Sequence, residues 1–243
     1  MTAGSAFFPV VGVVLSNVLY FSSWPAVQTA YTTGRLGSLN VLPTALMVLS
    51  TISWMSYALY ISNGYIMASN LPGAIAAMGF TVVLLPLIPR ENATARMQVQ
   101  FVLVFGTAAA LILWTCLVLS NADFEQRKFA LGLYATGLCV ALFASPLSTA
   151  YEVITTANAA SIYAPLTAAQ CTNCLMWTIY GVSIGDVWVY GPNGTGLVLG
   201  LVQLVLKCLF SSTPLKRSEE RALRPAKDSS KESDIGSDDN EAA

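Results

Sequence analysis

Long hydrophobic stretches without charge alternate with short polar segments along this chain. Asp, Glu, Lys and Arg are absent from residues 1–34, 36–89, 97–122, 129–151, 153–185 and 187–206. A helix that crosses a bilayer needs about 20 predominantly apolar residues, and it satisfies its own backbone polar groups in lipid. The pattern predicts seven transmembrane helices, at about 6–30, 40–61, 65–88, 98–119, 129–154, 163–183 and 190–211. The predicted fold class is an all-α integral membrane protein in a lipid bilayer.

Composition supports this class and excludes several others. Hydrophobic residues make up 55% of the 243 positions and charged residues 10%, whereas soluble domains carry about 25% charged residues. Five cysteines without any histidine argue against a disulfide framework and against a His-containing metal site. Cys171 and Cys174 form a CxxC within a predicted helix, where small apolar packing is the favoured interpretation. No cofactor is expected, and nothing in the sequence favours nucleic-acid binding.

Four residue types recur at one fixed spacing, with the members of each pair 123 positions apart. They are Trp54, Tyr57, Asn70 and Gly73, followed by Trp177, Tyr180, Asn193 and Gly196. The recurrence predicts a duplicated three-helix unit with the fourth helix as a connector, a 3+1+3 arrangement. We divide the chain into a first repeat (1–95), a linker helix (96–124), a second repeat (125–212) and a disordered cytoplasmic tail (213–243). A single connecting helix makes the two repeats parallel, and parallel repeats place the substrate site between them near the membrane midplane.

The repeated Trp and Asn are 16 residues apart, on opposite sides of a short turn. On antiparallel helices both lie about 12 Å from that turn, which is near the middle of a hydrocarbon core about 30 Å thick. Taken alone, each Trp is explained by packing or interfacial anchoring, and each Asn by an interhelical hydrogen bond. Their equal depth in both copies favours a binding site instead. Asn supplies a hydrogen-bond donor and an acceptor, and Trp a flat apolar face with one N–H.

Prolines are also paired between the two repeats. Pro25 and Pro43 in the first correspond roughly to Pro146 and Pro165 in the second. A proline inside a helix removes a hydrogen bond and bends the helix, so these four form a predicted hinge or gate. The alternative is that prolines are simply common in membrane helices.

Basic residues predict the orientation. Arg35, Arg90, Arg96 and Lys207 lie with the tail on one side, and only Arg127 and Lys128 on the other. The positive-inside rule places the N-terminus outside and the C-terminus in the cytoplasm. The first helix lacks a preceding basic region and a clear cleavage site, so we expect it to be the first span rather than a removed signal peptide.

Four segments of the second repeat give the chain a specific resemblance to the SWEET sugar transporter family. They are Ala144-Ser-Pro-Leu-Ser148, Asn173-x3-Trp177-x2-Tyr-Gly181, Pro192-Asn-Gly-Thr-Gly196 and Gly200-Leu-Val-Gln203. The resemblance implies a central site for mono- or disaccharides, lined by Trp54, Asn70, Trp177 and Asn193, with Ser50 and Asn173 four residues before each Trp. The first repeat departs from the family: Ser23-Trp24-Pro25 stands where two prolines one residue apart are usual, and Ser50 replaces a frequent Asn.

Charge placement bears on how transport is driven. Only Glu152 and Asp186 approach the predicted helices, and both lie near helix ends. Ion-coupled carriers usually contain intramembrane carboxylates or histidines, so the sequence predicts a facilitative uniporter. A proton-coupled carrier of another polar solute and a seven-helix receptor remain alternatives. An intramembrane enzyme is the least favoured class, because no paired Asp, Ser–His set or metal cluster can be assembled. We expect the plasma membrane, with an internal membrane as the alternative, and homo-oligomerisation is left open.

Overall fold

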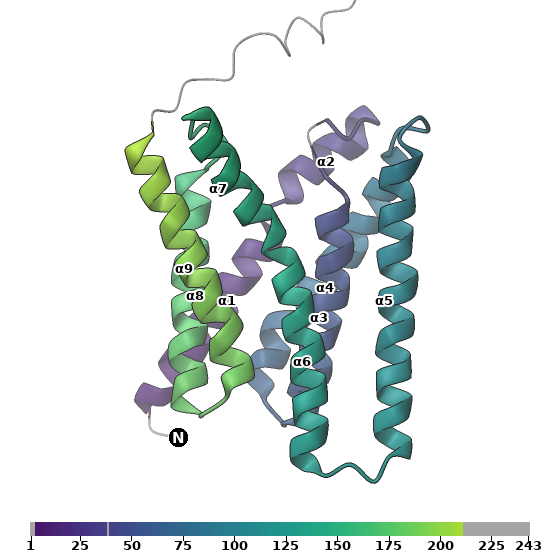
Figure 1. Cartoon of the computed structure of the whole chain (residues 1–243), viewed down its shortest axis with the longest axis vertical. Helices are drawn as coiled ribbons and strands as arrows, with labels where there is room; N and C mark the ends of the chain where they lie inside the picture. The colour runs from purple at the N-terminus through teal and green to yellow at the C-terminus, as the bar shows by residue number, and fades with distance from the viewer. Residues whose placement is uncertain (1–2, 38, 211–243) are drawn as a thin grey trace, which may run out of the picture.

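The computed structural model describes residues 3–37 and 39–210, and the regular secondary structure of this part of the chain is entirely helical. Its elements, in order, are α1 (Ala3–Phe21), α2 (Trp24–Thr33), α3 (Leu42–Tyr60), α4 (Gly64–Leu84), a 3-10 turn η1 (Leu85–Leu87), α5 (Ala93–Leu119), α6 (Phe124–Leu142), α7 (Ala144–Thr156), α8 (Ala164–Ser183) and α9 (Val187–Leu209). Figure 1 shows them as one bundle of roughly aligned helices. The all-α fold class is confirmed within these ranges, whereas the tail predicted at 213–243 lies outside the described residues.

The helices make seven passes through the bundle, as predicted. Two passes are broken, because α1 and α2 are separated at Ser22 and Ser23, and α6 and α7 at Phe143. Six of the passes are long and apolar enough to cross a membrane by length and hydropathy. The remaining pass is α8, whose 20 residues are more polar, including Thr167, Gln170 and Asn173. Those three side chains line a cavity, which explains why this helix departs from the hydrophobic pattern.

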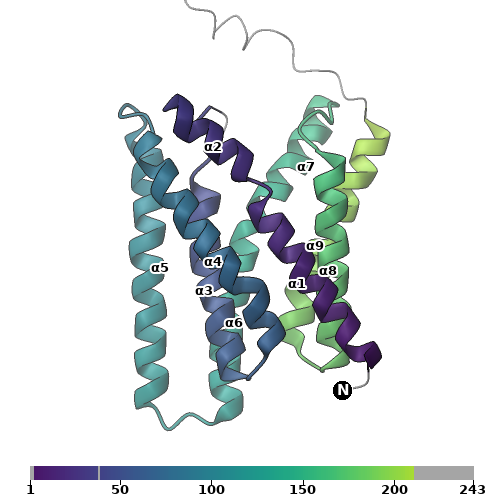
Figure 2. The same ribbon diagram turned by 180° about the vertical axis from the view of Figure 1, so that it is seen from behind.

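Two matching sets of helices meet across the bundle. We call α1–α4 with η1 the first unit and α6–α9 the second unit, with α5 connecting them. Within the units, α3 packs against α4 and α8 packs against α9. Between the units, α1 packs against α8 and α6 packs against α3. The first helix of each unit therefore contacts the second helix of the other, and these two contacts form the interface (Figures 1 and 2).

The two ends of the bundle are packed differently. We call the end where α1 begins the N-terminal side; it carries the α3–α4, α5–α6 and α8–α9 connections, and the opposite end is the C-terminal side (Figure 1). Toward the N-terminal side, one hydrophobic cluster joins both units, with Trp54, Tyr57, Ala58 and Ile66 from the first, and Leu131, Ala135, Trp177, Tyr180 and Val189 from the second. On the C-terminal side each unit has its own cluster. The units are thus held together by apolar packing mainly at one end.

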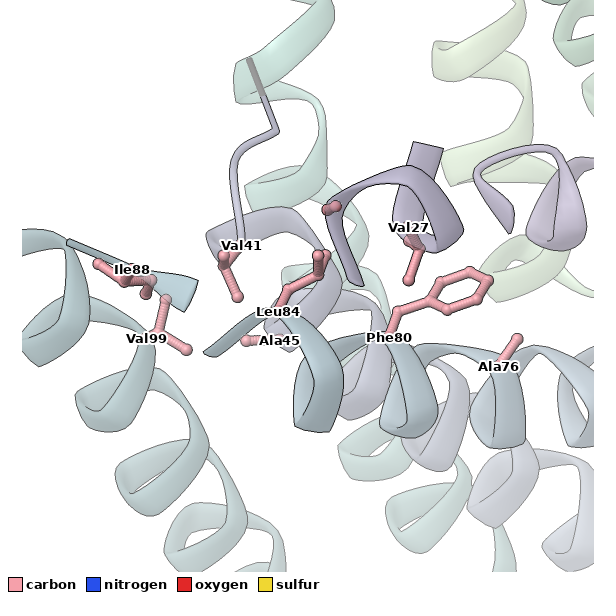
Figure 3. Close-up of a cluster of buried hydrophobic side chains, with 9 residues drawn as sticks. Val27, Val41, Ala45, Ala76, Phe80, Leu84, Ile88 and Val99 are labelled. Atoms are coloured by element: carbon pink, nitrogen blue, oxygen red, sulfur yellow. The ribbon is translucent and has the colours of Figure 1, made fainter. Parts of the chain in front are cut away.

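The C-terminal cluster of the first unit secures α2 and the start of α5. Val27 of α2 packs with Phe80 and Leu84 of α4, and Ile88 and Val99 continue the same cluster into α5 (Figure 3). The corresponding cluster of the second unit consists of Val153, Ala159, Ile162 and Leu206. Neither cluster contains residues from the other unit, so the described apolar cores leave the units separate at this end.

The four predicted hinge prolines occupy helix starts rather than helix interiors. Pro25, Pro43 and Pro165 lie in the first turn of α2, α3 and α8, and Pro146 is the third residue of α7. A proline there removes no intrahelical hydrogen bond, because the first amides of a helix have no partner within it. Pro25 and Pro146 nevertheless follow the two helix breaks closely. The prolines inside helices are instead Pro9, Pro72 and Pro192.

Candidate functional site

A cavity of about 560 Å³ lies between the two units. Its volume falls in the usual range for small-molecule sites, about 300–1,000 Å³. All six residues predicted from the sequence to bind substrate line it: Ser50, Trp54, Asn70, Asn173, Trp177 and Asn193. Of the predicted hinge prolines, Pro146 belongs to the lining, whereas Pro25, Pro43 and Pro165 lie outside it.

Each cavity tryptophan is held by the first helix of the opposite unit. Trp177 Nε1 donates to Ser16 Oγ at 3.0 Å, and Ser16 Oγ donates to Asn173 Oδ1 at 3.0 Å. In the other half, Trp54 Nε1 donates to Cys139 Sγ at 3.1 Å. Ser16 and Cys139 are themselves 123 positions apart. The contacts therefore follow the duplication, with a thiol in one copy where the other has a hydroxyl.

Both indoles also contact a tyrosine one turn away. The ring centroids of Trp54 and Tyr57 are 5.7 Å apart at an interplanar angle of 82°, and those of Trp177 and Tyr180 are 5.8 Å apart at 74°. These edge-to-face contacts match the quadrupoles of the rings and fix the indole planes. The nearly equal geometry in both units leaves two similarly oriented aromatic faces in one site.

The two asparagines of the repeat pair, Asn70 and Asn193, are anchored through their amide nitrogens. Asn70 Nδ2 donates to the carbonyl oxygen of Ile66 at 2.9 Å, and Asn193 Nδ2 donates to that of Val189 at 2.8 Å. Each bond reaches the residue four positions earlier in the same helix. One N–H of each amide is thereby used within its own helix, which leaves the second N–H and the carboxamide oxygen for other partners.

The N-terminal side of the cavity is closed by hydrogen bonds between the units. The Tyr57 hydroxyl lies 2.8 and 2.7 Å from the two carboxylate oxygens of Asp186, which is only 3% exposed. In the reverse direction, Asn63 Nδ2 donates to the Tyr180 hydroxyl at 2.8 Å. The pairs are reciprocal, because Tyr57 matches Tyr180 and Asn63 matches Asp186 at the same 123-residue offset. Lys128 Nζ lies 3.9 Å from Asp186 Oδ2.

Asn63 and Asp186, the partners of the two tyrosines, are held in place because each is the N-cap residue of a helix. Asn63 Oδ1 accepts from the backbone N–H groups of Tyr65 and Ile66 at the start of α4. Asp186 Oδ1 accepts from the N–H of Trp188 at the start of α9. An N-cap side chain is held in place by these bonds. Each turn therefore presents a rigid polar group to the tyrosine of the opposite unit.

On the opposite side, the cavity continues toward the ends of α7 and α9. Its lining extends to Thr149, Leu166 and Gln203, and it includes no residue of the turns at 61–63 and 184–186. The cavity therefore faces the C-terminal side. Among the residues that the structure describes, those lining it include no Asp, Glu, Lys or Arg. A neutral solute with hydroxyl groups matches such a lining.

Sequence reasoning missed several of these contacts. The sequence did not mark Ser16, Cys139 or Asn63 as contact residues, and it marked Asp186 only as a candidate coupling group. The signal was available for two of the pairs, because Ser16 with Cys139 and Asn63 with Asp186 repeat at 123 residues. The two members of each pair are different amino acids, so a comparison of the repeats for identical residues does not find them.

Comparison with known proteins gives a family assignment. The model of a family described as "Sugar efflux transporter for intercellular exchange" matches residues 6–92 and again 129–215. The chain belongs to this family, the SWEET family. The two matched segments contain all of the cavity residues named above.

Curated SWEET proteins and a solved SWEET structure are similar to the chain over most of its length. "Bidirectional sugar transporter SWEET2a" from Sorghum bicolor is 29% identical over 222 residues, 89% of this chain and 87% of that protein. "Sugar transporter SWEET1" from Rattus norvegicus is 25% identical over 178 residues, 72% of this chain and 76% of that protein. The structure titled "The 3.7 A resolution structure of a eukaryotic SWEET transporter" superimposes with a TM-score of 0.74 at 21% identity, covering 84% of this chain and 95% of the other. This last likeness supports the fold.

Proposed function

We propose that this chain is a facilitative transporter that carries a mono- or disaccharide across a membrane by alternating access. The observation that carries the proposal is the cavity between the units, which has no charged residue in its described lining, contains two Trp and three Asn, and is closed on one side by hydrogen bonds between the units. The printed names of the curated relatives, which are sugar transporters in a plant and in a mammal, agree with it. The family is one of transporters rather than enzymes.

The cavity chemistry suits a sugar. Trp54 and Trp177 offer apolar faces to the C–H groups of a pyranose ring, while Asn193 and Asn173 offer amide groups to its hydroxyls. Because the described lining has no charged group, a neutral solute can bind without removing water from a charge. Transport then requires no coupling ion, because no intramembrane carboxylate reaches the solute. We therefore propose uniport rather than proton-coupled transport.

Alternating access follows from the unequal ends of the bundle. In the conformation described, the N-terminal side is closed by the Tyr57–Asp186 and Asn63–Tyr180 bonds, and the cavity faces the C-terminal side. Rocking of the two units would break these bonds and bring α2 and α7 together at the other end. The breaks before Pro25 and Pro146 are positioned to serve as hinges in this movement.

The distribution of basic residues supports an orientation. Arg35, Arg90 and Arg96 are on the C-terminal side, whereas Arg127 and Lys128 follow the α5–α6 connection on the N-terminal side. We propose that the C-terminal side is cytoplasmic, so that the conformation described is open to the cytoplasm. The plasma membrane is the proposed location, and fractionation of expressing cells distinguishes it from an internal membrane.

The proposal is tested by uptake of radiolabelled glucose and sucrose into transporter-deficient cells that express the chain or its Asn193→Ala variant. A uniporter gives flux that a proton uncoupler does not reduce, and Asn193→Ala lowers it strongly at equal surface expression. Flux that collapses with the uncoupler would refute uniport. Flux unchanged by the substitution would refute the assignment of the site, and no flux of either sugar by surface-expressed protein would refute sugar transport.

A further inference from the structure

Asn70 and Asn193, the cavity asparagines that form a repeat pair, differ in their hydrogen bonding. Asn70 makes three side-chain hydrogen bonds: Nδ2 donates to the Ile66 carbonyl and to Ser69 Oγ, and Oδ1 accepts from the Tyr20 hydroxyl at 3.3 Å. Asn193 makes one, from Nδ2 to the Val189 carbonyl. Among the described residues, no hydrogen bond reaches Asn193 Oδ1. The carboxamide oxygen of Asn70 therefore already accepts one hydrogen bond, whereas that of Asn193 accepts none from the described residues.

The difference arises from two substitutions between the repeats. Phe143 stands 123 positions after Tyr20 and has no hydroxyl, and Pro192 stands 123 positions after Ser69 and has no side-chain donor or acceptor. Tyr20, Phe143, Ser69 and Pro192 all line the cavity. The second copy thus has the same framework around its asparagine but lacks both of the polar groups that hold Asn70.

The ring positions show that Tyr20 and Phe143 are structural equivalents. The Tyr20 ring lies directly on Gly73, since a Cβ built on that glycine would be 2.5 Å from Tyr20 Cε2. The Phe143 ring lies on Gly196, with a corresponding distance of 3.4 Å to Phe143 Cε1. Gly73 and Gly196 are themselves a repeat pair. A hydroxyl added to Phe143 would therefore project toward Asn193 as the Tyr20 hydroxyl does toward Asn70.

We infer that Tyr20 is a positioning residue that withdraws the Asn70 carboxamide oxygen from substrate binding, so that Asn193 provides the free amide acceptor for a sugar hydroxyl. This rests on the proposed sugar transport. Asn70 is 7% exposed, consistent with a carboxamide held against its own unit. Because Tyr20 and Asn70 both belong to the first unit, rocking between the units leaves their bond intact. The sugar is bound asymmetrically, with its hydroxyls toward α8 and α9.

Two opposite substitutions test the inference. Tyr20→Phe frees Asn70 Oδ1, which gives the sugar a second acceptor, and Phe143→Tyr adds a hydroxyl that occupies Asn193 Oδ1. One neutral hydrogen bond corresponds to a change of about 2- to 10-fold in affinity. We expect KM for equilibrium exchange of the transported sugar to fall by this factor in Tyr20→Phe and to rise by it in Phe143→Tyr. The double variant, which exchanges the roles of the two copies, should return close to the original KM.

The measurement uses the purified full chain in liposomes with radiolabelled glucose, or sucrose if the unsubstituted chain carries only that. Tyr134→Phe is the matched control, because it removes a tyrosine hydroxyl that donates to the Gly106 carbonyl at 2.7 Å, away from the cavity lining. Its KM should be unchanged. A purely structural role for Tyr20 would lower the maximal rate or the yield of folded protein without moving KM in opposite directions in the two variants.

A second measurement applies if Phe143→Tyr fails to fold. In the Asn193→Ala background, Tyr20→Phe should restore part of the lost flux, because Asn70 becomes available as an acceptor. Unchanged or increased KM in Tyr20→Phe, or no rescue of Asn193→Ala, overturns the inference while leaving sugar transport standing. Absence of sugar flux in the unsubstituted chain overturns the proposed function itself.

Discussion

The hydrogen bond between Tyr57 and Asp186 should control how often the N-terminal side of the bundle opens. Tyr57→Phe removes a hydroxyl 2.7–2.8 Å from both oxygens of a carboxylate that is 3% exposed. A hydrogen bond to a charged group contributes about 1.5–3 kcal/mol, because the buried charge loses a partner without gaining water. This bond exists only while the two units are in contact at this end. Its loss should therefore shift the equilibrium toward the open state by about 10- to 150-fold.

The shift can be measured as a distance distribution between spin labels at the starts of α4 and α9. Gly64 and Val187 are suitable positions, since both are exposed and 123 residues apart, and a Cβ added at Gly64 meets no atom within 4 Å. The exposed Cys116 and Cys208 are first replaced by serine to avoid labelling elsewhere. We expect Tyr57→Phe to move population from a short distance to a longer one in reconstituted protein.

Asp186→Asn provides the control. An amide at this position can still cap α9 and bind Tyr57, as Asn63 caps α4 and binds Tyr180 in the other half. Its effect on the distribution should be smaller than that of Tyr57→Phe. If Tyr57→Phe leaves the distances unchanged, the bond is not what holds this end closed, and the reasoning from buried charge is wrong.

Three further outcomes follow from the packing of the cavity. Cys139→Ser should leave KM for sugar exchange within about 2-fold of its original value, because Ser16 makes the same contact with the other indole. Cys139→Val cannot accept a hydrogen bond from Trp54 and should raise that KM. Gly181→Ala should destabilise the protein by about 1–3 kcal/mol, because the added Cβ would lie 2.6 Å from the Tyr190 backbone nitrogen. Thermal unfolding in detergent should show a lower midpoint, and an unchanged midpoint would contradict the close approach of α8 and α9. Gly73→Ala should impair transport, because the added methyl group would clash with the Tyr20 ring. Combining it with Tyr20→Ala should remove the clash. A double variant that folds and reaches the surface no better than Gly73→Ala would argue against this explanation.

The hydrophobic pattern was sufficient to predict the seven passes, because lipid leaves a spanning segment few conformations other than a helix. It could not predict the breaks at Ser22–Ser23 and Phe143, since both lie inside stretches without a charged residue. It also placed the four hinge prolines inside helices, whereas the structure has them in the first turns. A proline in an apolar stretch suggests a kink, but whether the helix begins just before it depends on packing at the adjacent break.

The sequence alone determined the duplication and the central residues of the cavity, because identical residues at one spacing survive in both copies. Trp54 and Asn70 share a depth by helix geometry, and their partners in the second copy share it by repetition. That information is local to each unit. It predicts which side chains lie at mid-membrane, and the family resemblance predicts what they bind.

The tertiary structure decided how the two copies meet. Only the packing of α1 on α8 and of α6 on α3 brings Tyr57 to Asp186 and Ser16 to Trp177, across more than a hundred residues of chain. The same packing determines which end is closed. These are contacts between units, whose formation depends on the relative placement of whole helices, and no periodicity within either unit specifies that placement.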